Sequence, residues 1–198
     1  MAAIDSIRHL EQRTSNTAAS GLFLSAVTAL EGLDYLGELD GRKPARYSTD
    51  NHFADMIDVA HVRWATSSCI TVIDLCVAGL GQMYLPPKPR DREYSFSDIK
   101  VPLHGNQPSR EWQLIPRCAQ RWLRRVAADV SYSRVASVRH SLIHRQLARH
   151  LTIGPRGRYR LRFRFGDKRL AVGTVLSRAR SAARRHFFSL VAVMPKLP

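Results

Sequence analysis

The residues of this chain best suited to chemistry are an arginine and two histidines that lie close together, Arg139, His140 and His144. Histidine exchanges protons near neutral pH, and arginine carries a fixed charge whose donors match a phosphate group. In a helix, residues four apart lie on one face, so the two imidazoles fall together with the guanidinium beside them. The apolar residues fall on the other flank: Val135, Val138 and Leu142. A cation beside paired imidazoles is suited to handling phosphate.

RNA cleavage is a reaction that such a group of side chains can perform. RNA carries its own nucleophile, so a protein needs to move protons at the 2′-oxygen and at the leaving 5′-oxygen, and to neutralise charge on the phosphorane. A histidine can do the first and Arg139 the second. We therefore expect a reaction without a metal ion that leaves a 2′,3′-cyclic phosphate, with Arg139, His144 and His140 as the catalytic residues.

The segment Arg139-His-Ser-Leu-Ile-His144 resembles the motif of the HEPN superfamily (higher eukaryotes and prokaryotes nucleotide-binding), in which an arginine and a polar residue precede a histidine. The resemblance implies a four-helix bundle, usually dimeric, whose arginine and histidine meet near the dimer interface to cut RNA. The position after the arginine is typically asparagine or another short polar residue. Here it is His140, which is either a second proton carrier or the residue that orients the first.

The spacing of the motif is not distinctive in a chain with 26 arginines and 8 histidines. Four other pairs match it when four to six intervening residues are allowed: Arg145/His150, Arg46/His52, Arg134/His140 and Arg180/His186. The pair Arg139/His144 differs from these four in its context, because it lies late in a long helical run. A β-ribbon and a last helix follow this run.

A metal centre is the alternative use of His140 and His144, since two imidazoles four residues apart can share a metal ion. A third ligand is hard to find, because residues 100–198 contain only three acidic residues. We therefore expect no metal and no cofactor. Histidines with no chemical role remain the other alternative.

The three cysteines, Cys69, Cys76 and Cys118, form no C-x-x-C pair and argue for a reducing compartment. The first twenty residues contain no uninterrupted apolar stretch of the kind found in signal peptides. The most apolar window, Cys69 to Leu80, is short for a membrane span and contains Asp74. These features predict a cytoplasmic protein with no membrane partner.

The net charge of +15 is concentrated in one half of the chain. Residues 1–99 hold 9 lysines and arginines against 13 acidic residues, whereas residues 100–198 hold 22 against 3. Self-repulsion of that size indicates a polyanionic partner, nucleic acid before membrane. The alternative is a basic surface that only faces solvent.

Four long runs with helical periodicity dominate the chain, at about residues 17–41, 50–83, 109–151 and 174–194. Ile4, Ile7 and Leu10 either extend the first run backwards or form a separate turn. The third run carries the motif, with a kink expected at Pro116 and a weak point at residues 131–133. Asp74, inside the second run, needs a partner, either a structural salt bridge or an arginine of the third run such as Arg139.

The segment Arg158 to Phe165 alternates between arginine and apolar residues, which predicts a strand with two distinct faces. Together with its neighbours it predicts a small antiparallel β-ribbon at residues 151–172. We expect Arg145, Arg158, Arg160, Arg162 and Arg164 to bind nucleic acid. The alternative is that the strand uses positive charge to prevent edge-to-edge aggregation.

Taken together, these patterns predict a mainly α fold: a single domain over residues 1–198, arranged as a four-helix up-and-down bundle like that of HEPN proteins. The β-ribbon lies between the third and fourth long helices, and a proline-containing loop spans residues 85–107. The leading function is a metal-independent ribonuclease, either a toxin or a defence effector, acting on RNA as a homodimer, with an antitoxin protein as a possible partner. The alternative is a non-catalytic nucleic-acid-binding or regulatory helical-bundle protein. A third candidate is a structural interaction protein of a larger complex.

Overall fold

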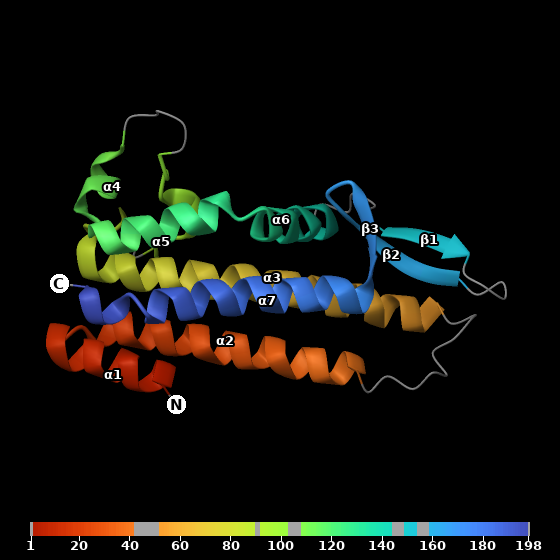
Figure 1. The fold of residues 1–198 in the computed structure, drawn as a ribbon, viewed down its shortest axis with the longest axis horizontal. Coiled ribbons are helices and arrows are strands. Elements are labelled where there is room, and N and C mark those ends of the chain that lie inside the picture. The colour runs from red at the N-terminus through yellow and green to blue at the C-terminus, as the bar shows by residue number, and fades with distance from the viewer. Residues whose placement is uncertain are drawn as a thin grey trace. The chain divides into compact units, whose positions relative to one another are not determined.

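The computed structural model describes residues 2–41, 52–89, 92–102, 108–143, 149–153 and 159–197. Most of these residues are helical (Figure 1). The α-helices are α1 (Ala2–Thr14), α2 (Thr17–Gly41), α3 (His52–Tyr84), α4 (Arg110–Leu114), α5 (Arg117–Ala128), α6 (Val130–Ile143) and α7 (Val172–Val191). Two 3-10 helices, η2 (Phe96–Asp98) and η4 (Met194–Lys196), and three strands complete the described elements. The prediction of a mainly helical fold with a small antiparallel sheet is confirmed.

The chain divides into two compact units. Unit 1 comprises Met1–Ala29, Thr71–Asp129 and Ala183–Pro198, and unit 2 comprises Leu30–Ile70 and Val130–Ala182. Helices α2, α3 and α7 therefore each contribute residues to both units, whereas the break between α5 and α6 coincides with a boundary. The four-helix up-and-down arrangement remains a prediction.

Unit 1 is built around large side chains removed from solvent, including Phe23 of α2, Trp122 of α5 and Phe187 of α7. The indole Nε1 of Trp122 donates to the backbone oxygen of His186 at 2.8 Å, so this buried donor is satisfied. Ile7 and Leu10 of α1 are also buried. Residues 2–14 thus form a separate helix that packs against η4, which settles the alternative that the sequence left open.

The helix ends in unit 1 follow from local residues. Asn16 caps α2 by accepting the backbone N–H of Ala19 at 2.9 Å, and Ser109 caps α4 by accepting the N–H of Trp112 at 3.2 Å. Pro116 separates α4 from α5, as predicted. A weak point in the helix was predicted at residues 131–133. This position was wrong by a few residues, because the helix breaks at Asp129.

Unit 2 contains the antiparallel sheet, formed by β1 (Arg149–Ile153), β2 (Tyr159–Phe165) and β3 (Lys168–Ala171) in that order. Phe163 and Phe165 are buried, so the predicted apolar face is confirmed over the part of β2 whose side chains are described. Helix α6 packs against β2 and buries Val135 and Val138. Gly166 turns β2 into β3 with φ of 65°, a conformation that favours glycine.

One boundary prediction was wrong. The third helical run was expected to reach residue 151, with His150 at its end, but His150 and Leu151 lie in β1 and pair with Arg162 and Leu161. Pairing with a neighbouring strand overrides a weak helical pattern of this kind.

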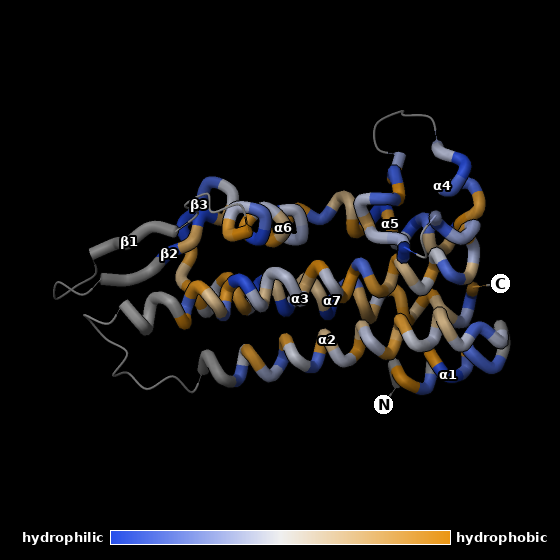
Figure 2. Tube along the Cα trace, turned by 180° about the vertical axis from the view of Figure 1, so that it is seen from behind, coloured by the Kyte–Doolittle hydropathy of each residue, from blue (hydrophilic) through white to orange (hydrophobic). Residues whose placement is uncertain are grey.

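Helix α3 includes Ile57–Tyr84, a stretch long and apolar enough to cross a membrane by length and composition. It is longer than the window considered from sequence, but 67% of its most apolar part is buried within the protein. Figure 2 shows apolar and polar residues interleaved along α2, α3 and α7 rather than in separate blocks. Both features are compatible with core helices of a soluble protein.

Candidate nucleic-acid interface

Helix α6 carries the described part of the motif. Arg139 is half-buried and His140 is exposed, one residue apart near the end of the helix. Val135, one turn before Arg139 on the same face of the helix, and Val138 are buried, so Arg139 lies at the edge of the buried face and His140 lies on the exposed one. His144 and Arg145 lie outside the described residues.

The guanidinium of Arg139 is enclosed but not fully satisfied. Its Nε is shielded from solvent, and within the described part of the chain it has no hydrogen-bond partner. The Nε of Arg162 in β2 is in the same situation, although its Nη1 donates to the backbone oxygen of Arg169 at 3.3 Å. A shielded donor without an acceptor costs free energy. An anionic group that reached this donor after a rotation of the side chain would supply the acceptor.

The sheet presents further arginines, and Arg162, Arg164 and Arg169 are here called the sheet arginines. Arg164 and Arg169 pair directly across β2 and β3, so two cations lie side by side on one face. Like charges in this position destabilise a sheet. Arg160 lies in β2 opposite Thr152, and Arg158 falls outside the described residues.

Acidic residues are scarce in the part of the chain that carries α6 and the sheet. From residue 130 to the end of the chain, Asp167 is the only one. It lies 3.6 Å from the guanidinium of Arg134 in α6. From α2, Asp34 accepts a hydrogen bond of 2.6 Å from Arg180. Unit 2 therefore combines locally paired arginines with a sheet face where positive charges adjoin.

Sequence reasoning missed a buried histidine in unit 1. His186, treated only as a chance copy of the motif, is 3% exposed, and its Nε2 lies 2.6 Å from Oδ2 of Asp129. The same carboxylate oxygen accepts a hydrogen bond from Arg185. Burial lowers the pKa of His186, although the Asp129 carboxylate acts in the opposite direction. The periodicity of α7 indicated only that one face is apolar.

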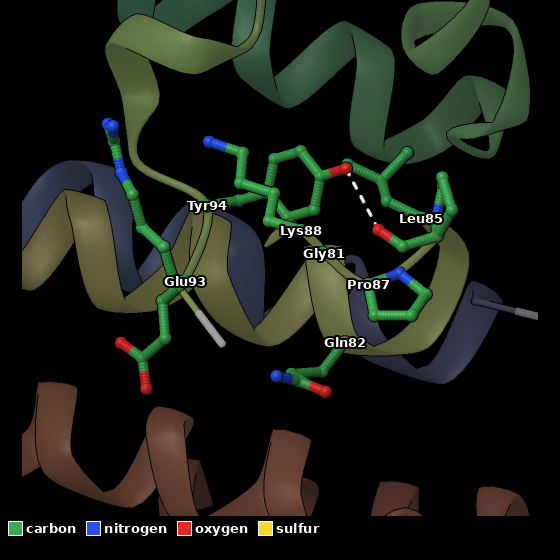
Figure 3. Close-up of a pocket in the computed structure, with 9 residues that line it drawn as sticks. Gly81, Gln82, Leu85, Pro87, Lys88, Glu93 and Tyr94 are labelled. Atoms are coloured by element: carbon green, nitrogen blue, oxygen red, sulfur yellow. Dashed lines mark hydrogen bonds between the residues drawn. The ribbon is translucent and has the colours of Figure 1, made fainter. Parts of the chain in front are cut away.

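The loop after α3 also has more structure than its prolines suggested (Figure 3). A cavity of about 300 Å³ lies beside Tyr94, whose hydroxyl donates to the backbone oxygen of Pro86 at 2.9 Å. The Lys88 ammonium lies over the Tyr94 ring and 2.7 Å from Asp98. Burial would raise the pKa of Asp98, but hydrogen bonds from Lys88 and Ser95 hold it well below its usual range. These contacts order the described parts of the loop.

Asp74, whose partner the sequence left open, accepts the backbone N–H of Phe96 at 2.8 Å. This amide belongs to η2 in the loop, so the carboxylate helps to hold the loop on α3. Within the described ranges, no three histidine, cysteine or acidic side chains are placed to hold a metal ion.

Comparisons of this chain with protein-family models, with curated proteins and with solved structures gave no match.

Proposed function

We propose that the protein binds RNA through unit 2 and cleaves it without a metal ion. The observation that carries this proposal is the pair of half-buried guanidinium groups, at Arg139 and Arg162, whose Nε donors are shielded from solvent without an acceptor among the described residues. A phosphate group would satisfy such a donor with charge-assisted hydrogen bonds once the side chain turns and exposes it. The adjoining charges of Arg164 and Arg169 support the same partner, since a polyanion relieves their repulsion.

In the cleavage reaction, Arg139 neutralises the charge that develops on the phosphorane. His144 takes the proton from the 2′-hydroxyl or delivers one to the leaving 5′-oxygen. His140, exposed on α6 next to Arg139, either carries the second proton or orients the first histidine. The resemblance to HEPN ribonucleases supports the same assignment of roles.

The exposed face of α6 supports the expected homodimer. Its exposed residues recur at helical spacing: Val130, Ser133, Ser137, His140 and Ile143. The two apolar members are 60% and 39% exposed, with small serines between them. A second copy packed on this face would cover them and bring the two Arg139 regions together. Sedimentation showing only monomer at tens of micromolar would count against this arrangement.

Cleavage by purified variants tests the catalytic assignment. Arg139→Ala and His144→Ala are each expected to lower the rate by about a hundredfold or more. His9→Ala, which changes an exposed histidine of α1, is the matched control and should keep full activity. A His144→Ala protein that cleaves at the normal rate would overturn the mechanism.

Binding without cleavage is the outcome that favours the alternative, a non-catalytic nucleic-acid-binding protein. Affinity for a single-stranded RNA should fall steeply with salt in either case. Replacing the three sheet arginines by glutamine should lower the slope of log affinity against log salt by up to about two. An unchanged slope would assign these residues to edge protection instead.

A further inference from the structure

Helix α5 in unit 1 carries a row of exposed arginines that the proposed site does not use. Arg117, Arg121 and Arg125 follow one another at intervals of four residues, and Arg124 lies beside them. At a rise of 1.5 Å per residue, successive members of the row are separated by about 6 Å along the helix. This separation is comparable to that of successive phosphates along a nucleic-acid strand.

The arginines of this row do not stabilise α5. Like charges four residues apart destabilise a helix, and α5 contains no acidic residue to offset them. Arg117 is the first residue of the helix, at the end where the helix dipole disfavours a cation. The nearby carboxylate of Asp129 is bonded to Arg185 and His186. A polyanionic ligand would therefore relieve repulsion along the row.

A cation–π contact between Arg124 and Trp112 lies beside the row. The guanidinium of Arg124 lies over the ring of Trp112, 5.3 Å from its centroid. Trp112 is only 3% exposed, so it holds the guanidinium from the inner side while Arg124 stays exposed. Nucleic-acid bases stack on arginine planes held in this way.

A hollow of about 560 Å³ opens where α4 meets α5. Its lining includes Trp112, Leu114 and Pro116, with Arg117 at the start of the arginine row. Gln120 fixes its wall by donating from Nε2 to the backbone oxygens of Trp112, at 2.8 Å, and of Ile115, at 2.9 Å. Leu114 is 48% exposed and presents an apolar side chain to the hollow.

We infer that the α4–α5 surface is a second nucleic-acid site, which binds a single strand. Its phosphates contact Arg117, Arg121 and Arg125, and an unpaired base enters the hollow beside Leu114. Single-stranded RNA is the expected ligand, and that choice rests on the proposed function. The surface itself selects single strands over duplexes, because paired bases cannot enter the hollow.

Binding of fluorescent RNA oligonucleotides to the full chain tests this inference. Arg121→Gln/Arg125→Gln should lower the salt slope by about 1.4, at roughly 0.7 for each phosphate contact of a single strand. Arg8→Gln removes an exposed charge of α1 and should leave the slope unchanged. Leu114→Ala should weaken single-strand binding about threefold or more. The same variant should leave duplex binding unaffected. Thermal melts confirm that each variant is folded.

Other results overturn the inference in distinguishable ways. In one such result, the α5 variant keeps the salt slope of the unchanged protein while the variant of the three sheet arginines has a lower one. This result contradicts the second site and is consistent with the proposed function. Normal slopes for both variants remove the second site and assign the sheet arginines to edge protection, whereas the proposed function is decided separately by the cleavage assay with Arg139→Ala. Vesicles of phosphatidylserine and phosphatidylcholine test a membrane surface as the partner. If the α5 variant loses vesicle binding and keeps RNA binding, the surface binds lipid and the inference is wrong.

Discussion

Replacing Gly79 of α3 by alanine tests how tightly unit 1 is packed. A Cβ at this position would lie 2.7 Å from two carbons of the Phe23 ring, and ordinary contacts begin at 3.4 Å. The ring is fully buried and has no solvent side to move into. We therefore expect the clash to cost about 2–3 kcal/mol, the upper part of the usual range for overpacking. Alanine returns up to about 1 kcal/mol through its helix propensity.

Gly21→Ala is the matched control, because a Cβ on this glycine of α2 meets nothing within 4 Å. It should gain about 1 kcal/mol from helix propensity alone. The two variants should then differ by about 2–3 kcal/mol, or roughly 5–10 °C in Tm for a chain of this size. Thermal unfolding followed by circular dichroism measures the difference. Equal Tm values for the two variants would refute the packing described for Phe23, whereas Phe23→Leu should reduce the penalty of Gly79→Ala.

Three further predictions concern the sheet turn and the buried histidine. Gly166→Ala should cost about 1–2 kcal/mol in the free energy of unfolding, because alanine disfavours a positive φ and its Cβ would lie 2.7 Å from Nε of Arg134, which must move. Gly166→Asn should cost less, which denaturant titration can check. Asp129→Asn should cost about 1.5–3 kcal/mol, since it removes the charged acceptor beside His186. Because burial lowers the folded-state pKa of His186, the unfolded chain takes up the proton first, and stability should fall as pH drops below about 6.5. A His186→Gln protein whose stability falls equally over that range would assign the effect to other groups.

Periodicity predicted the elements whose contacts are regular. The long runs became α2, α3 and α7, and the alternation around Phe163 and Phe165 gave a strand with a buried apolar face. In these segments burial repeats with the period of the helix or strand. The order of apolar and polar residues along the chain is therefore enough to predict the element.

Contacts between distant residues decided what the sequence could not show. The break at Asp129 coincides with the capture of its carboxylate by Arg185 and His186, more than fifty residues away. Residue 150 joined a strand because β2 offers an edge to pair with. The shielding of Nε of Arg139 is likewise a property of the folded chain, which the spacing of a motif does not reveal.

The chemistry of cleaved RNA ends is the most direct test of the proposed function. The purified full chain is incubated with single-stranded RNA in the presence of EDTA, and the products are analysed by mass spectrometry. Cleavage that leaves 2′,3′-cyclic phosphate and 5′-hydroxyl ends, and that Arg139→Ala abolishes, is the predicted result. Intact RNA, cleavage that stops with EDTA, or full activity of the Arg139→Ala protein would contradict it.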